Sequence, residues 1–347
     1  MLKVSFRTVS LEKLYPLTIS RGTSGTTENL FVFVTDGTHT GVGELAPAAA
    51  TAPDWDAVRG EREISEYAAD GIAPSPYQAY DDMKARGVCP PASAALEMAL
   101  WDLLARQASL PLYRLLGLPR KSVPTSVTIG LNPPEVTLER VTHILSLTQA
   151  KCLKIKLGSP EGLDHDREHF LAAAASAKPF GAVLRVDANG GWTVAKAKQM
   201  IPWLAEHGVE YVEQPLPLGM EDGYPEIFEG RALPVFADES IKFAPDVVKM
   251  ADRVDGINLK LMKCGGVVEA LRIVATARAH GLKTMIGCMS ESSVGIAPGA
   301  AIGALFDYID LDTHTNLAPD PAIGLAWENG VVLPPNAPGH GVTLKEA

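Results

Sequence analysis

The sequence lacks disulfide motifs, signal or membrane segments, and the basic stripes that are typical of nucleic-acid-binding proteins. Its four cysteines are widely spaced and form no Cys-x-x-Cys motif, which favours a reducing compartment. No apolar run reaches about 18 residues and the first residues lack a signal-peptide core, so we expect neither a membrane partner nor export. The 31 basic residues form no stripe among 41 acidic ones, which argues against nucleic acid. We therefore expect a cytoplasmic protein that acts on a small molecule. The sequence is compatible with a homo-oligomer as well as with a monomer.

The first third of the chain has strand patterns and then helical ones. Two apolar segments are joined at Asp36-Gly37, which is typical of a hairpin. The preceding residues 19–27 are polar and glycine-rich, which predicts a mobile loop. Leucines at helical spacing predict one long helix over residues 91–117. Together these segments indicate an α+β domain over residues 1–120.

From about residue 121 the pattern changes to strands that alternate with helices. This alternation predicts βαβ units and a parallel sheet, and eight such strands close into a (β/α) barrel. An open doubly wound sheet is the competing fold, but no Gly-x-Gly-x-x-Gly follows the first strand. We expect the barrel over residues 121–324, and a tail of about 325–347 that returns to the first domain. The strands are expected near residues 124–128, 152–156, 182–187, 209–213, 234–237, 256–260, 283–287 and 307–310.

Acidic residues close three successive strands of the predicted barrel. They are Asp187, Glu213 and Asp238, separated by nearly equal intervals. One such residue would usually cap the next helix. Three together at the carboxyl ends of neighbouring strands, where barrel enzymes place their chemistry, form a set of hard oxygen ligands. The sequence therefore predicts a Mg²⁺ site.

Lysines stand on two of the predicted strands. Lys154 and Lys156 are two positions apart and share one face of a strand. A lone Lys-x-Lys is usually a solvated edge, but Lys260 ends a strand on the opposite side of the barrel. Two bases that face each other can remove a proton from one side of a carbon and return it on the other, through an enediolate that the metal stabilises. We expect burial and nearby cations to lower the lysine pKa values.

This pattern favours racemisation or epimerisation over hydrolysis. Neither a Gly-x-Ser-x-Gly motif nor a Cys-His pair is evident. A non-catalytic small-molecule binder is the remaining alternative, but it would have no use for buried lysines.

The order of motifs along the chain is specific. It runs Lys154-x-Lys156, Asp187-x-Asn189, Glu213-Gln214-Pro215, Asp238-Glu239-Ser240 and Lys260-x-x-Lys263-x-Gly265-Gly266, preceded by Pro111-Leu112-Tyr113-x-Leu115-Leu116-Gly117. This order resembles the muconate-lactonising subgroup of the enolase superfamily over nearly the whole chain. The resemblance implies a modified TIM barrel, (β/α)₇β, beneath an N-terminal α+β capping domain.

Within that subgroup, Asp310-x-Asp312 resembles the paired acids of the dipeptide epimerases, such as L-Ala-D/L-Glu epimerases. The resemblance implies that this pair holds the substrate's α-ammonium group, and i, i+2 carboxylates do share a face. It also implies that Lys154 contacts the substrate carboxylate, and that Lys156 and Lys260 serve opposite stereoisomers.

Three further positions match substrate contacts less specifically. Thr128 ends the first barrel strand and Cys288 the seventh, and either side chain could simply pack. Arg21 lies in the predicted loop, where a cation would suit an acidic C-terminal residue. We place Glu239 behind the metal ligands and assign no chemistry to Lys263.

The expected activity is Mg²⁺-dependent epimerisation of L-Ala-L/D-Xaa dipeptides, with L-Ala-Glu one candidate, by two-lysine 1,1-proton transfer. The alternatives within the superfamily are a muconate cycloisomerase, an o-succinylbenzoate synthase and an N-acylamino-acid racemase.

Overall fold

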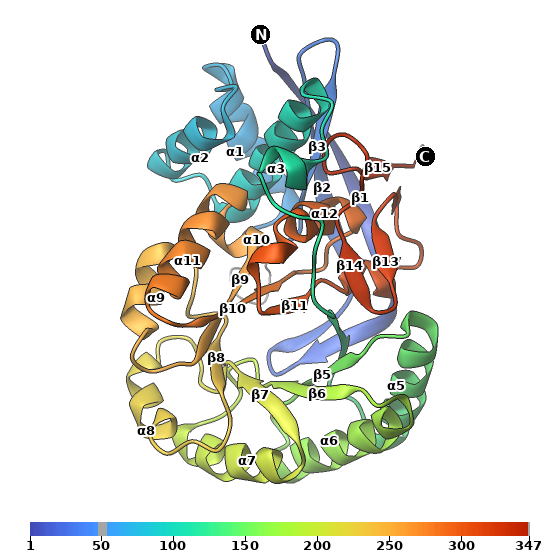
Figure 1. Cartoon of the computed structure of the whole chain (residues 1–347), viewed down its shortest axis with the longest axis vertical. Coiled ribbons are helices and arrows are strands. Elements are labelled where there is room, and N and C mark those ends of the chain that lie inside the picture. The colour runs from blue at the N-terminus through green and yellow to red at the C-terminus, as the bar shows by residue number, and fades with distance from the viewer. Residues whose placement is uncertain (48–53, 346–347) are drawn as a thin grey trace.

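The computed structural model describes residues 1–47 and 54–345 of the chain and consists of a capping domain above a barrel (Figure 1). The capping domain is an antiparallel sheet in the order β1-β2-β3, covered by helices. The β2–β3 hairpin turns at Asp36-Gly37, which confirms the expected hairpin. The elements are β1 (Lys3–Ile19), β2 (Gly22–Thr35), β3 (Thr40–Leu45), α1 (Ala57–Ala69), α2 (Pro76–Ala85), α3 (Pro90–Gln107) and the short α4 (Leu112–Leu115).

Helix α3 packs closely against strand β3. A Cβ atom on Gly43 would lie 2.0 Å from the carbonyl oxygen of Ala95, so this approach requires glycine. The helix ends at Gln107, and the prediction that it continues to residue 117 was wrong. Pro111 has no N–H group and disfavours helical backbone at Leu110, so the chain breaks there and restarts as α4.

The polar segment 19–27 is a hairpin rather than the expected loop. Strands β1 and β2 pair up to Ile19 and Gly22, and only two residues form the turn. Backbone pairing compensates for the low apolar content of this segment, because each strand satisfies the other's N–H and C=O groups. The tip of the hairpin reaches over the barrel, where the Ser20 hydroxyl donates to the carbonyl oxygen of Asn189.

The second part of the chain is a (β/α)₇β barrel, as expected. Eight parallel strands follow one another in sequence order, and a bridge between Thr125 and Ile309 joins the last strand to the first. The strands are β4 (Ser126–Ile129), β5 (Cys152–Lys156), β6 (Val183–Asp187), β7 (Val209–Glu213), β8 (Val235–Ala237), β9 (Gly256–Lys260), β10 (Lys283–Gly287) and β11 (Tyr308–Asp310). The helices between them are α5 (Pro134–Thr148), α6 (Leu163–Ala177), α7 (Val194–Glu206), α8 (Tyr224–Phe228), α9 (Ala244–Met250), α10 (Leu261–Cys264), α11 (Val267–Ala279) and α12 (Ser293–Ala301).

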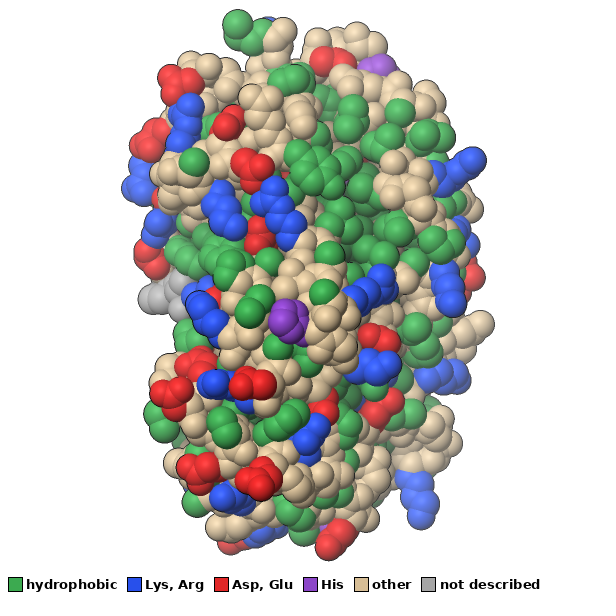
Figure 2. Space-filling view, turned by 60° about the vertical axis from the view of Figure 1, so that its left-hand side comes forward, with side chains coloured by type: hydrophobic (Ala, Val, Ile, Leu, Met, Phe, Trp, Pro, Cys, Tyr) green, Lys and Arg blue, Asp and Glu red, His purple; other side chains and the backbone are tan. Residues whose placement is uncertain are grey.

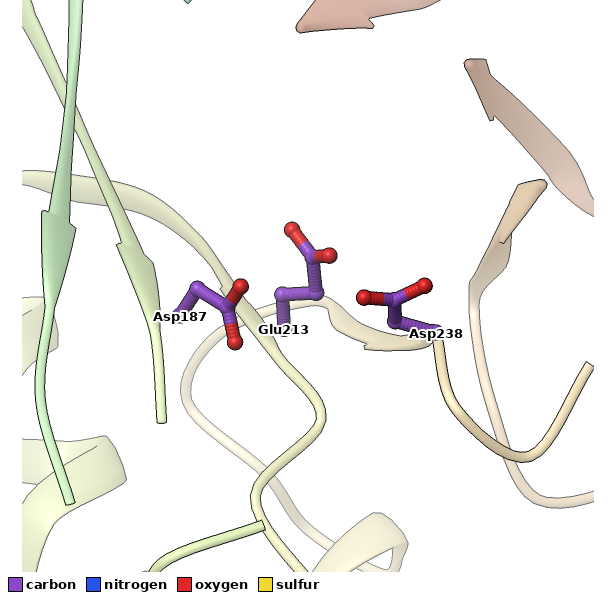
Figure 3. Close-up of side chains that lie close together, drawn as sticks. All are labelled: Asp187, Glu213 and Asp238. Atoms are coloured by element: carbon purple, nitrogen blue, oxygen red, sulfur yellow. The ribbon is translucent and has the colours of Figure 1, made fainter. Parts of the chain in front are cut away.

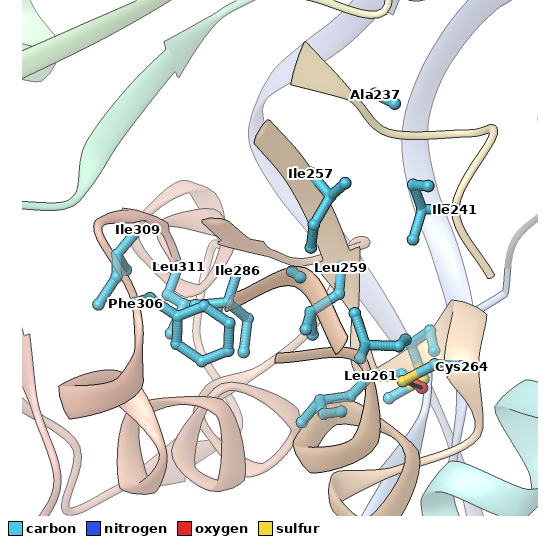
Figure 4. Close-up of a cluster of buried hydrophobic side chains, with 14 of the residues drawn as sticks. Ala237, Ile241, Ile257, Leu259, Leu261, Cys264, Ile286, Phe306, Ile309 and Leu311 are labelled. Atoms are coloured by element: carbon cyan, nitrogen blue, oxygen red, sulfur yellow. Dashed lines mark hydrogen bonds between the residues drawn. The ribbon is translucent and has the colours of Figure 1, made fainter. Parts of the chain in front are cut away.

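Alternate residues of the barrel strands build the core outside the barrel. In β9, Ile257 and Leu259 pack with the helices, as do Ile286 of β10 and Ile309 of β11 (Figure 4). The residues between them in sequence face the barrel interior because successive strand side chains point to opposite faces. The interior near the amino ends of the strands is filled by a separate apolar cluster of Tyr211, Phe236, Met285 and Tyr308. The inward-facing residues nearer the carboxyl ends of the strands therefore form a polar site above this apolar cluster.

The tail of the chain lies against the capping domain. After β11 it forms the short strands β12 (Ala322–Ile323), β13 (Ala326–Glu328), β14 (Val331–Leu333) and β15 (Thr343–Leu344). His340 donates its backbone N–H to Asp102 of α3 at 2.8 Å, and its ring contacts the carbonyl oxygen of Val42 at 3.0 Å. These contacts join the end of the chain to its beginning.

The surface carries charges of both signs. Figure 2 shows one face on which Lys and Arg are interspersed with Asp and Glu, without a continuous basic stripe. Among the described residues, no helix combines the length and the apolar character needed to cross a bilayer.

Candidate active site

Three carboxylates from neighbouring strands meet at the carboxyl end of the barrel (Figure 3). Asp187 ends β6, Glu213 ends β7 and Asp238 follows β8, and all three side chains are fully buried. Each offers an oxygen atom, and these oxygens lie within 4.8 Å of one another. A buried set of hard oxygen donors with this spacing fits a Mg²⁺ ion, as expected from the sequence.

The three carboxylates repel one another. Burial and the neighbouring Asp187 raise the pKa of Glu213 to about 8. Burial also opposes the ionisation of Asp187 and Asp238, but the lysines that contact them outweigh it and hold the pKa values of both below the usual range. The cluster therefore concentrates negative charge that a divalent cation would neutralise.

Unusual backbone conformations follow two of these ligands and fix their direction. Asn189 and Gln214 both have a left-handed backbone, with φ of 44° and 36°. The backbone N–H of Asn189 donates to Asp187 at 2.7 Å, and the side-chain oxygen of Gln214 accepts the N–H of Asp238 at 2.8 Å. The strained turns thus orient acids from two strands.

Lys156 and Lys260 stand on opposite sides of the barrel mouth. Their strands, β5 and β9, are four apart in an eight-stranded barrel, with the three acidic strands between them. Lys156 Nζ contacts Asp187 Oδ2 at 2.6 Å, and Lys260 Nζ contacts Asp238 Oδ2 at 2.7 Å. Burial opposes the charge of Lys260, but Asp238 outweighs it and raises its pKa. The carboxylate of Asp238 thus acts against the lowering that burial and nearby cations produce, and the lowered pKa stays a prediction.

Lys154 joins the cluster of three carboxylates to Asp310 at the end of β11. Its Nζ donates to Glu213 Oε2 at 2.6 Å and also to Asp310 Oδ2. Burial opposes this charge, but the two acids hold the pKa of Lys154 well above its usual value. The other oxygen of Asp310, Oδ1, is buried and has no hydrogen-bond partner within the described parts of the chain. Asp310 lines the cavity, where its carboxylate is suited to receive a cation.

Asp312 lies beside Asp310 at the same rim. Its Oδ2 accepts the backbone N–H of Thr128 at 2.7 Å, which orients the carboxylate. Burial and the nearby Asp310 raise the pKa of Asp312 to about 6. The pair therefore holds negative charge in a buried position that favours a positive partner.

One cavity of about 380 Å³ brings most of the predicted residues together. Its lining includes Lys154, Lys156, Lys260, Asp310, Asp312, Thr128, Cys288 and Arg21. Asp187, Glu213 and Asp238 do not belong to this lining. The Cys288 thiol donates to the carbonyl oxygen of Asp310 at 3.2 Å, so Cys288 supports the rim as well as facing the cavity.

Arg21 lines the cavity, but a neighbouring acid compensates its charge. Its guanidinium forms an ion pair with Glu239 and donates to the carbonyl oxygen of Asn189. Asn189 in turn contacts Asp187 at 3.0 Å through its side-chain amide. The hairpin tip is thus bonded to residues that adjoin Asp187 and the carboxylate cluster.

Lys263 is a site residue that sequence reasoning missed. It was assigned no chemistry because it lies beyond the end of β9, yet its side chain is only 3% exposed. Its Nζ donates to the carboxylate and the carbonyl oxygen of Asp238. The available signal was its spacing of three residues from Lys260, because a helical turn places i and i+3 on one side.

A capping domain above a barrel, with three carboxylates between two lysines at the barrel mouth, is the arrangement expected for the enolase superfamily. Sequence comparison indicates the same superfamily. The chain belongs to the mandelate racemase / muconate lactonizing enzyme family of the enolase superfamily. The N-terminal domain model of that family matches residues 1–117, and the model described as "Enolase C-terminal domain-like" matches residues 138–347. The superfamily that the sequence motifs indicated is therefore confirmed.

Individual relatives within this family are dipeptide epimerases. The chain is 55% identical over 346 residues to a "Hydrophobic dipeptide epimerase" of Roseobacter litoralis, with 100% of both chains covered. It is 51% identical over 350 residues to a protein of the same description from a Flavobacteria bacterium, with 99% of each covered. A dipeptide epimerase of Enterococcus faecalis, solved with Mg and L-Leu-L-Tyr, superposes with a TM-score of 0.91 at 30% identity and 98% and 99% coverage. The enzyme class of these relatives is the isomerase class expected from the sequence.

Proposed function

We propose that this protein epimerises dipeptides at the α-carbon of the C-terminal residue. The observation that carries the proposal is one cavity that contains two opposed lysines, Lys156 and Lys260, together with the carboxylate pair Asp310 and Asp312. Opposed bases suit a reaction that inverts a carbon, and a paired acid suits a substrate with a free ammonium group. A muconate or succinylbenzoate substrate carries no such cation.

The order of groups around the rim orients the substrate. Its ammonium group would lie against Asp310, at the end of β11, and Asp312, which follows that strand. Its carboxylate would point toward the three acidic residues at the ends of β6, β7 and β8, with Lys154 between these acids and Asp310. Mg²⁺ held by the three carboxylates would supply positive charge opposite the negative charge that develops on the substrate. The α-carbon then lies between β5 and β9.

Each lysine serves one face of that carbon. Lys156 would take the α-proton from one stereoisomer, and Lys260 would deliver a proton to the opposite face. The reverse reaction exchanges their roles. Asp187 and Asp238 lie 2.6 and 2.7 Å from the two Nζ atoms and orient both lysines before the substrate arrives. The lysine that takes the α-proton must be neutral, and the lysine that delivers a proton must be charged.

The cavity favours an apolar C-terminal side chain. Leu17 and Ile19 of the hairpin and Met289 after β10 contribute apolar lining. The one arginine in the lining, Arg21, is paired with Glu239 and so offers little charge to an acidic substrate. The relatives from Roseobacter litoralis and the Flavobacteria bacterium are described as hydrophobic dipeptide epimerases, which supports the same substrate class. We therefore place L-Ala-L-Leu ahead of L-Ala-L-Glu.

Deuterium incorporation tests the proposal directly. The protein is incubated with Mg²⁺ in D₂O and L-Ala-L-Leu, L-Leu-L-Tyr, L-Ala-L-Glu or N-acetyl-L-leucine, and each product is analysed by mass spectrometry and chiral chromatography. We expect incorporation and inversion with the two apolar dipeptides. Incorporation into N-acetyl-L-leucine alone would indicate an acylamino-acid racemase, and no incorporation across a dipeptide library would exclude the proposed activity.

A further inference from the structure

A buried glutamate of the capping domain binds the barrel segment that follows Lys260. Glu97 lies in α3 and its side chain is fully buried. Its carboxylate accepts the backbone N–H groups of Val267 and Val268, each at 2.7 Å, and the indole N–H of Trp101 at 3.0 Å. Val267 and Val268 are the first two residues of α11. A residue of one domain thus binds the start of a helix in the other.

Helix α11 depends on this contact because it has no cap of its own. Its N-cap residue is Gly266, which has no side chain to accept the free N–H groups of the first turn. A Cβ atom on Gly266 would lie 2.0 Å from Glu97 Oε2, so the position must be glycine to admit the carboxylate. Glu97 therefore occupies the place of an N-cap side chain.

Other capping-domain groups hold the same segment between Lys260 and α11. The Tyr80 hydroxyl donates to the carbonyl oxygen of Cys264 at 3.2 Å, and the backbone N–H of Ala46 lies 3.4 Å from the sulfur of Met262. From the barrel side, Lys263 is bonded to Asp238. The chain that leaves Lys260 is thus fixed between the capping domain and a metal ligand.

We propose that Glu97 is a positioning residue for Lys260, so that the capping domain sets one of the two bases. This inference rests on the proposed epimerase activity. The rate of proton transfer falls steeply when a base is displaced by up to about 1 Å. The backbone of Lys260 continues directly into the segment that Glu97 anchors. Lys156 lies across the barrel on β5, away from this contact. Loss of the Glu97 contact should therefore affect the two faces of the substrate unequally.

Glu44 provides a matched control. It is another fully buried glutamate of the capping domain, and it binds the start of α12 through Ser292 N at 3.0 Å and Gly295 N at 2.8 Å. The segment before α12 includes Cys288 and Met289, which line the cavity and carry neither base. Glu44→Gln should therefore weaken substrate binding for both epimers alike.

The test measures deuterium exchange without inversion, from each epimer of L-Ala-Leu separately, in Mg²⁺ and D₂O. Lys260→Met defines which epimer depends on Lys260. Glu97→Gln, which offers an NH₂ group to one of the two backbone donors, should slow exchange from that epimer about tenfold and from the other less than about twofold. Gly266→Ala, which disturbs the same contact from the α11 side, should also slow exchange from the two epimers unequally.

Two measurements keep the outcomes distinct. Thermal melting checks that each variant is folded, and amide hydrogen exchange of the peptide containing residues 261–270 should be faster in Glu97→Gln and unchanged in Glu44→Gln. Equal slowing of both epimers by a folded Glu97→Gln protein, or unchanged amide exchange, would overturn the positioning role while the epimerase activity stands. A wild-type protein that exchanges neither epimer of any dipeptide would remove both.

Discussion

Replacing Asp312 by asparagine removes one charge from the ammonium site while the local hydrogen bond remains. Its Oδ2 accepts the backbone N–H of Thr128 at 2.7 Å, and the amide oxygen of asparagine can accept the same bond. Lys154 is bonded to Asp310, so the substitution at residue 312 leaves the bonded partners of this buried lysine in place. The change is therefore mainly the loss of one negative charge next to the cavity.

The magnitude follows from the burial of this carboxylate. Asp312 is only 8% exposed, so water screens its charge weakly. A hydrogen bond to a charged group contributes about 1.5–3 kcal/mol, which corresponds to a KM raised by about 10- to 150-fold. Because Asp310 remains and the two lysines are unchanged, kcat should fall much less than kcat/KM.

Steady-state kinetics with L-Ala-L-Leu, followed by chiral chromatography, measures the effect. Asp307→Asn is the matched control, because Asp307 precedes β11 at the opposite end of the strand and is bonded to Thr284 and Lys283 outside the cavity. The variant and the wild type should differ little toward N-acetyl-L-leucine, which has no ammonium group. An unchanged KM for the dipeptide in Asp312→Asn would refute the assignment of this pair to the ammonium group.

Four further outcomes are expected. The raised pKa of Asp312, about 6, means that the carboxylate gains a proton as the pH falls through 6, so kcat/KM should fall below that pH, and this acid limb should be absent in the residual activity of Asp312→Asn. Dialysis against EDTA should abolish epimerisation, and Mg²⁺ should restore it and raise the melting temperature. Lys156→Met and Lys260→Met should each slow epimerisation by at least about 10²-fold while exchange survives from one epimer, a different one in each variant. Gly43→Ala should lower the free energy of unfolding by about 3 kcal/mol in urea titrations because its Cβ would collide with a carbonyl oxygen of α3, whereas Gly25→Ala, whose Cβ meets nothing nearer than 3.8 Å, should change it little.

The barrel and its rim could be predicted because both follow from local patterns. Alternating apolar residues marked the strands, and the expected ranges 152–156, 209–213, 256–260 and 283–287 coincide with β5, β7, β9 and β10. Parallel strands of a barrel end at one rim, so charged residues at strand ends meet without further information. Asp187 and Lys260 could be placed near one site for this reason alone.

The rest depends on contacts between distant parts of the chain. Lys263 contacts Asp238 across 25 residues, and Glu97 binds Val267 across 170 residues. The spacing of Lys263 from Lys260 indicates only that the two lysines share one side of a turn, and no local pattern identifies the partner of either Lys263 or Glu97. The effect of Asp238 on the pKa of Lys260 could not be predicted for the same reason, since the two side chains lie beside each other only in the folded barrel. Local signals were sufficient for the elements and insufficient for the partners of buried charges.

The ring of side chains at the barrel mouth has an approximate mirror plane. A line across the barrel from β7 to β11 passes between two similar halves, each with a lysine bonded to an aspartate, Lys156 with Asp187 and Lys260 with Asp238. The proposed reaction needs one group at each face of a carbon, and the two lysines are placed on either side of this plane although every residue that carries them has the same L configuration. Lys154 and Lys263 break the reflection, because they occupy unlike positions on the two sides. Under the proposed activity, these unmatched parts of the rim are one source of a difference between the rates at which the two epimers react.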